Sequence, residues 1–151
     1  MSVELFLLFY MFPCVEFWLY IGQITPEQND EIARLVSEKI PPSREFLISH
    51  FPGVLGKIEK FAKTQNRDPW DFEVISQYWR NHHVEGENTP VVHGEVVEII
   101  ENPQKGKKQF LLIKEISTGK SFRVINEYDL LLEPGDYITV HGFFAIEKIQ
   151  E

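Results

Sequence analysis

The chain has 151 residues, of which 43% are hydrophobic and 13% aromatic, so it can form one domain or two small ones. Its 23 acidic residues against 15 Lys and Arg give a formal charge of −8, which repels phosphate backbones, so we expect no nucleic-acid partner. The single cysteine, Cys14, excludes an internal disulfide and fits a reducing compartment, which predicts a cytoplasmic protein.

The first apolar stretch, residues 3–12, predicts a helix that is buried or faces a partner. A signal peptide is not expected, because the stretch has no basic leader and no small-residue cleavage site after it. Pro13 and Glu16 interrupt the run well short of the roughly 20 apolar residues of a membrane span, so no membrane partner is expected either. The residues leave open whether this apolar N-terminal helix packs within the chain or forms a homo-oligomer.

Strong helix signals follow the N-terminal stretch. Thr25 can act as an N-cap, Pro26 suits the first helical position, and Gln28 at the third completes a capping box. Proline disfavours helical geometry in the residue before it and lacks a backbone donor, so the Pro41-Pro42 pair is expected to end this helix.

Two more stretches repeat apolar residues at helical spacing. Residues 54–62 place their apolar side chains on a single face. The last helix is expected to open at residues 68–71, with Asp68 as the N-cap and Pro69 at the first helical position. Its expected buried face consists of Phe72, Ile75, Tyr78 and Trp79.

From Val91 onward the apolar period changes to two, which predicts strands. Gly94 and Val96 are expected to alternate with their neighbours over residues 91–99. Polar turns separate the later strands, and one of them, residues 133–136, is expected to use Gly135 at a positive φ. Five or six short strands at this spacing predict a small, closed or nearly closed barrel of the OB-like kind.

These patterns together predict an α+β chain of two units. Residues 84–90 are polar and hold a glycine and a proline, which is typical of a linker. We therefore place a helical domain at residues 1–84, a linker at 85–90 and a barrel at 91–151.

The chain shows no nucleophile motif, glycine-rich phosphate loop or paired carboxylates, so we expect that it is not an enzyme. His82 and His83 lie at an expected helix end, where the helix dipole and solvation favour histidine without a metal. His93 and His141 each lie beside a glycine in an apolar strand. Each can be a satisfied barrel residue, or a ligand or contact at the barrel mouth.

The last third of the chain carries a turn of Pro-Gly-Asp-Tyr type, a strand that reaches a histidine, and then a Phe-Ala-Ile strand start. The residues concerned are Pro134, Gly135, Asp136, Tyr137, Val140, His141, Phe144, Ala145 and Ile146. This segment resembles the closing motif of the HypC/HupF family of nickel-iron hydrogenase assembly chaperones. Gly142 is displaced by one position, and Phe143 stands where the family has its glycine. Residues 94–99 are similar to the family's first strand, so the resemblance extends from Pro90 to Gln150.

The resemblance implies a small barrel that docks onto hydrogenase maturation partners. In the family, an N-terminal cysteine and the strand histidine are implicated in holding an iron-carbonyl-cyanide group. Here Thr89 occupies the cysteine position, and a hydroxyl does not replace a thiolate as a soft ligand. Such a cargo is expected only if another thiol takes part, which leaves His141, His93 and Cys14 as metal candidates.

We therefore expect a cytoplasmic accessory protein that docks to a hydrogenase large-subunit precursor or another maturation factor. The expected contact patch is His141, Phe143, Phe144 and His93, with Tyr137 supporting the strand. His141→Ala is expected to leave the fold intact and to abolish co-purification. Two alternatives stay open. One is an OB-like barrel that binds nucleic acid through turn residues Lys105, Lys107, Lys108 and Lys120, and the other is a histidine-based metal-binding protein.

Overall fold

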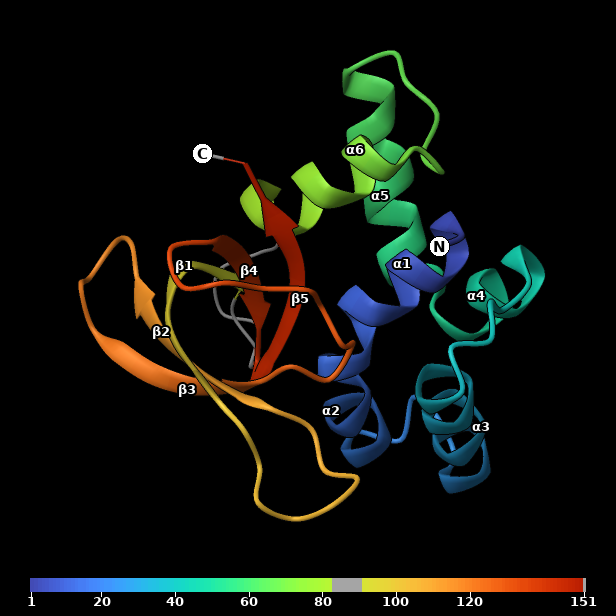
Figure 1. The fold of residues 1–151 in the computed structure, drawn as a ribbon. Coiled ribbons are helices and arrows are strands. Elements are labelled where there is room, and N and C mark those ends of the chain that lie inside the picture. Colours follow the sequence, from blue (N-terminus) through green and yellow to red (C-terminus); the bar gives the residue numbers. More distant parts are fainter. Residues whose placement is uncertain (83–90, 151) are drawn as a thin grey trace. The chain divides into compact units, whose positions relative to one another are not determined.

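The computed structural model describes residues 1–82 and 91–150, and it confirms the α+β class (Figure 1). The chain divides into two compact units, Met1–Val84 and Glu85–Glu151, of which the first is helical and the second is a closed five-stranded barrel. The predicted linker at 85–90 lies outside the described residues. Each unit is therefore described by itself.

The described part of the helical unit contains six α-helices and two irregular helical turns. Their bounds are α1 Val3–Met11, η1 Phe12–Cys14, α2 Val15–Tyr20, α3 Pro26–Ser37, α4 Arg44–His50, α5 Pro52–Thr64, α6 Phe72–Gln77 and the π-helical turn η2 Tyr78–His82. Pro13 falls in η1, between α1 and α2. This position fits the missing backbone donor of proline, because the chain there departs from α-helical hydrogen bonding.

Helix α1 lies in the core of its unit. Every residue from Leu5 to Met11 is buried, and α1 packs against α3, α4 and α6. The ring of Tyr10 stacks on Trp79 at 5.6 Å, while Phe6 contacts Tyr10 edge to face at 5.3 Å. The apolar character of the first helix is thus matched by contacts within its own unit.

One helical stretch among the described residues, Val3–Tyr20, is long and apolar enough to cross a membrane by length and composition alone. The core helix of a soluble protein meets the same criterion, and 56% of this stretch is buried inside the structure. Burial inside the protein accounts for the apolar composition without a bilayer.

The capping signals in the sequence were correct for α3 and one turn early for α6. Thr25 caps α3 in a reciprocal capping box with Gln28. The helix ends at Ser37, before the proline pair, because Lys39 adopts a positive φ of 54° and closes a left-handed C-terminal cap. Helix α6 is capped by Asp71, not by Asp68, whose carboxylate accepts from the Trp70 N–H.

The buried face of α6 also differs from the prediction at one end. Ile75, Tyr78 and Trp79 are buried as expected. Phe72 is 46% exposed, and Val74 is buried in addition to the predicted residues. The difference follows from the later start of the helix, since Phe72 is its first residue and lies at the edge of the packed face.

The barrel consists of β1 Val91–Ile100, β2 Phe110–Glu115, β3 Ser121–Ile125, β4 Tyr137–His141 and β5 Phe144–Ile149. Its strand order is β1-β2-β3-β5-β4, closed by pairing of β4 with β1. Neighbouring strands are antiparallel except β3 and β5, which are parallel. This order is that of the predicted OB-like barrel.

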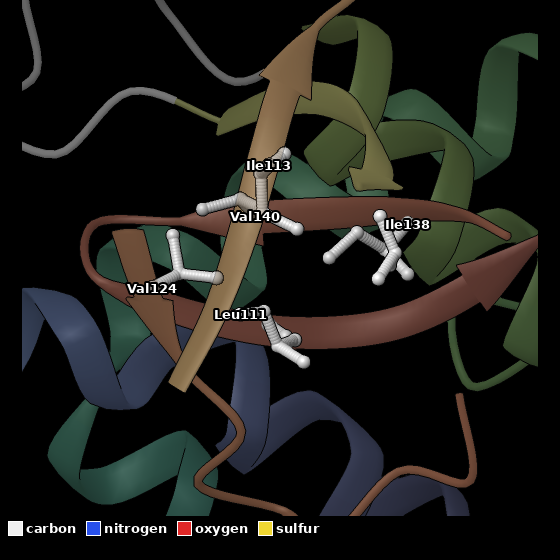
Figure 2. Packing of buried hydrophobic residues seen from close by; sticks show 7 residues of the cluster. Leu111, Ile113, Val124, Ile138 and Val140 are labelled. Carbon is white, nitrogen blue, oxygen red and sulfur yellow. The ribbon is translucent and has the colours of Figure 1, made fainter. Parts of the chain in front are cut away.

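The barrel core is formed by the side chains that point inward from all five strands (Figure 2). Its buried members are Val96, Leu111, Ile113, Val124, Ile138, Val140 and Ala145. Gly94 also lies on this inner side, and a Cβ atom there would come within 2.1 Å of the Ile113 Cγ2 atom. The glycine is therefore required by the close approach of β1 and β2.

The predicted alternation in β1 holds only for its first half. The pairing of β1 with β2 shifts register between Val96 and Glu98, as in a β-bulge. Val97 and Glu98 are consequently both exposed, and Ile99, not Glu98, returns to the core side.

The predicted turn before β4 is confirmed, with Gly135 at φ 97°. The Gly135 N–H donates to the Val96 carbonyl, and the Val96 N–H donates to the Asp136 carbonyl, each at 2.8 Å. The Asp136 carboxylate also pairs with Lys148 of β5 at 2.8 Å. The turn therefore joins three strands at the bulge of β1.

Candidate functional site

The candidate site is the outer side of β1, β4 and β5 together with the β4–β5 turn, because four of the five predicted contact residues lie on this side. Ile138 and Val140 of β4 point into the core, so Tyr137, Thr139 and His141 alternate to the outside. The strand pairing adds His93 opposite Thr139, and Phe144 opposite His141. Residues that are distant in the sequence thus share one side of the barrel.

His141, the central residue of the predicted contact patch, is buried in the structure. It is the last residue of β4, between Val91 of β1 and Phe144 of β5, and its exposed fraction is 0%. Thr139, one outward position earlier, is also 0% exposed. Strand alternation places His141 on the outer side of β4 but does not predict its burial.

Phe143 is the exposed member of the predicted patch, with 77% of its surface accessible. It lies in the two-residue turn between β4 and β5, where Gly142 adopts a φ of 62°. The Phe143 carbonyl accepts from the Ile125 N–H at 2.8 Å, which fixes the turn against the end of β3. The backbone is therefore held in place while the ring is exposed.

Phe144 follows Phe143 but is half-buried. Its ring contacts that of Tyr128 edge to face at 6.2 Å. Burial raises the pKa of Tyr128 well above its ordinary value, so the phenol stays neutral over the physiological range. The aromatic pair of Phe144 and Tyr128 therefore lies directly after the β4–β5 turn.

Two buried residues next to the turn, Tyr128 and Asn126, were not predicted from the sequence, and Asn126 is only 2% exposed. The Asn126 amide accepts from the Leu130 N–H and donates to the Leu130 carbonyl, each at 2.9 Å. These two hydrogen bonds close the loop in which Tyr128 lies, and the Tyr128 ring contacts Phe144 from this loop. No periodic pattern in the sequence marks Asn126 or Tyr128, because both residues lie in an irregular loop.

The remaining members of the patch, His93 and Tyr137, are both half-buried. His93 lies opposite Thr139 in the β1–β4 pair, and Tyr137 lies opposite Glu95. Cross-strand neighbours on one side are close enough for their side chains to interact. Both residues therefore belong to the paired strands β1 and β4, not to the β4–β5 turn.

The described residues include no group of three or more His, Cys, Asp or Glu that could hold a metal ion. His93 and His141 share one side of the barrel, as two ligands of a site would. Cys14 belongs to the helical unit, where it is buried at 4% exposure. The side chain of His82, as well as His83 and Thr89, lies outside the described residues.

No protein-family model matches the chain, and a search of curated proteins found no match either. The resemblance of residues 90–150 to the hydrogenase chaperone family remains a prediction from the motif. The geometry of the barrel surface is therefore the basis on which a function can be proposed.

Proposed function

We propose that the chain is a non-catalytic accessory protein of nickel-iron hydrogenase maturation, which docks onto a large-subunit precursor through the β4–β5 turn of a HypC-like barrel. The observation that carries this proposal is the 77% exposure of Phe143 within the motif that resembles the family. The proposed contact is thus Phe143, with Phe144 as its support. His141 is assigned a structural role.

The physical case is that of an aromatic anchor on a rigid support. A large exposed ring that enters a partner pocket removes much apolar surface from water, and aromatic residues are enriched among residues that dominate interface energies. The support is rigid because Gly142 sets the turn and the Ile125–Phe143 hydrogen bond holds its backbone. A preorganised turn loses little conformational entropy on binding.

The proposal does not include an iron cargo. A soft iron group requires thiolate ligation, and Thr89 replaces the family cysteine. Cys14, the one thiol of the chain, is a buried residue of the helical unit. The proposed function is therefore docking without transfer of a metal group.

The test is co-purification of the nickel-iron hydrogenase large-subunit precursor with the tagged full-length chain from its native host. Phe143→Ser is expected to weaken binding by about 30-fold or more, which corresponds to the roughly 2 kcal/mol of an interface hot spot. The precursor should then be lost from the purified material, while the circular dichroism spectrum and melting temperature stay at wild-type values.

Tyr20→Ser is the matched control, because Tyr20 is an aromatic residue of the helical unit with 87% exposure. It should leave co-purification unchanged. Retention of the precursor by Phe143→Ser would remove the assigned contact. Failure of the wild-type chain to retain any hydrogenase precursor would remove the proposed function itself.

A further inference from the structure

The barrel has a strongly uneven distribution of charge that the net charge of the chain conceals. Residues 105–123 carry six Lys and Arg against one acidic residue, Glu115. The rest of the described barrel, residues 91–104 and 124–150, carries one lysine, Lys148, against eight acidic residues. The basic segment consists of the end of the β1–β2 loop, strand β2, the β2–β3 turn and the start of β3.

The pairing of β2 with β3 shows how this segment presents its charges. Leu111, Ile113 and Val124 point into the core, so Leu112, Lys114 and Arg123 alternate to the outside. Leu112 lies opposite Arg123, and Lys114 lies opposite Ser121. Lys114 and Arg123 are both exposed, as is Lys120 in the adjoining turn. Glu115 alternates away from this outer face, and its carboxylate accepts from Ser117 and Thr118.

At the other end of the same face lie an aromatic ring and the lysines of the β1–β2 loop. Phe110 pairs with Ile125 on the outer side and is half-buried, so part of its ring remains accessible. Lys105 and Lys107 are exposed, while Lys108 pairs with Asp129 at 2.7 Å. The β2–β3 face therefore runs from loop lysines across Phe110 and Arg123 to Lys114 and Lys120.

We propose that the outer β2–β3 face binds single-stranded nucleic acid. Phosphates would lie against Arg123, Lys114 and the loop lysines, and a base would stack on Phe110. Single-stranded nucleic acid presents both negatively charged phosphates and flat apolar bases. The cations of this face complement the phosphates, and the aromatic ring complements the bases. An acidic peptide would complement the cations but would leave the aromatic ring without a matching group.

The neighbouring strand defines the track of the ligand. On β1, Glu95 lies opposite Lys114, and Glu98 lies opposite Leu112. These carboxylates repel phosphates, so the bound nucleic acid is expected to pass on the β3 side of Lys114, over Arg123. The face is short, and about four nucleotides, the lower end of the range for a barrel of this kind, would cover it.

The test uses the full-length chain and fluorescein-labelled dT15 and rU15, followed by fluorescence anisotropy between 50 and 200 mM NaCl, a range over which phosphate contacts should weaken binding by roughly tenfold or more. The wild-type chain should bind with an affinity that falls as salt rises. The double variant K114E/R123E should bind at least about tenfold more weakly. Its salt slope should be smaller by about 1.4, because each lost phosphate contact removes about 0.7 from the slope.

The matched control is K60E/K63E, which changes two exposed lysines of α5, outside the β2–β3 face. Each replacement of Lys or Arg by Glu lowers the formal charge of the chain by two. Both double variants therefore have a formal charge of −12 instead of −8. The control should keep most of the wild-type affinity. Equal losses in the two variants would show an effect of net charge only and would overturn the assigned face.

A further variant, Phe110→Leu, tests stacking. It should weaken binding by about fivefold or more and leave the salt slope unchanged, because a stacked base contributes without a charge. No binding of either oligonucleotide at 50 mM NaCl would overturn the proposal. Equally tight binding of a labelled poly-glutamate peptide that competes with dT15 would also overturn it, in favour of an acidic protein partner.

Discussion

Strand β4 and the β2–β3 hairpin belong to the same barrel but differ in how many of their sides are covered. From Ile138 to His141, every residue of β4 is buried, including the outward Thr139 and His141. In β2 and β3 only the inward positions are buried, and the outward ones carry Lys114 and Arg123 in contact with water. A strand covered on both sides contributes to stability, whereas a strand with one open side can also bind a ligand.

The difference in burial separates residues that lie in the same sequence motif. His141 and Phe143 are two positions apart, but the first is inside the structure and the second is at its surface. The open β2–β3 face carries no residue of the motif. Binding variants should therefore be placed at Phe143 or on β2–β3, and variants of β4 should report on folding.

The largest expected effect comes from His141→Ala. Truncation of a fully buried side chain leaves a cavity and removes its packing contacts, so the free energy of unfolding should fall by about 2–4 kcal/mol. Urea denaturation followed by circular dichroism measures the change. This result would replace the expectation that His141→Ala leaves the fold intact.

Arg123→Ala is the control on the open face and should change the free energy of unfolding by no more than about 0.5 kcal/mol, because the side chain is exposed. The contrast between β4 and β2–β3 would fail if both variants were equally stable. It would also fail if Arg123→Ala were the more damaging of the two.

A smaller effect, of opposite sign, is expected from Thr139→Val. The Thr139 hydroxyl is buried and has no hydrogen-bond partner among the described residues of the chain. Valine has nearly the same shape and removes the cost of that buried group, so the free energy of unfolding should rise by about 1 kcal/mol.

Thr118→Val serves as the comparison for Thr139→Val, since the Thr118 hydroxyl is exposed and donates to Glu115 at 2.7 Å. It should leave the free energy of unfolding unchanged or slightly lower. A loss of stability in Thr139→Val would mean that the hydroxyl has a partner in the folded protein, and that the outer side of β4 is a satisfied polar layer.

Local chemical signals in the sequence predicted much of the fold. The capping box at Thr25 and the turn at Gly135 were both correct, because each depends on a few neighbouring residues. Asp68 was the wrong cap, because its carboxylate accepts from the Trp70 N–H, while that of Asp71 accepts from the first N–H groups of the helix. The bulge after Val96 was missed because it arises from pairing with β2 and the turn at Gly135, which are distant in the sequence.

The candidate site was harder to predict than the fold. Period-two alternation placed His93 and His141 on the strands, but alternation alone does not predict that His141 is fully buried. The basic face was predicted only in part. The turn residues Lys105, Lys107, Lys108 and Lys120 were identified from the sequence as one alternative, but the alignment of Lys114, Arg123 and Phe110 on one face depends on the pairing of β2 with β3.

The smallest expected effect concerns Asp136, at the turn that leads into β4. Its hydrogen bond from Lys148, followed by the one from the Glu133 N–H, lowers the pKa of this carboxyl below its ordinary value. A lowered pKa in the folded state stabilises the fold above the unfolded pKa of about 3.9, and this contribution is lost as pH falls through the folded value. Asp136→Asn should therefore be less stable than wild type at pH 6, and the difference should shrink as pH falls below about 4.

Thermal melts of both proteins between pH 2.5 and 7 measure this convergence. In a Lys148→Gln background, the pH-dependent part of the difference should be smaller, because the larger cause of the pKa shift is gone. A difference that stays constant across the whole pH range would show that the Asp136–Lys148 pair does not stabilise the barrel. The covered strand β4 would then depend on its buried side chains alone, without help from the ion pair that joins its turn to β5.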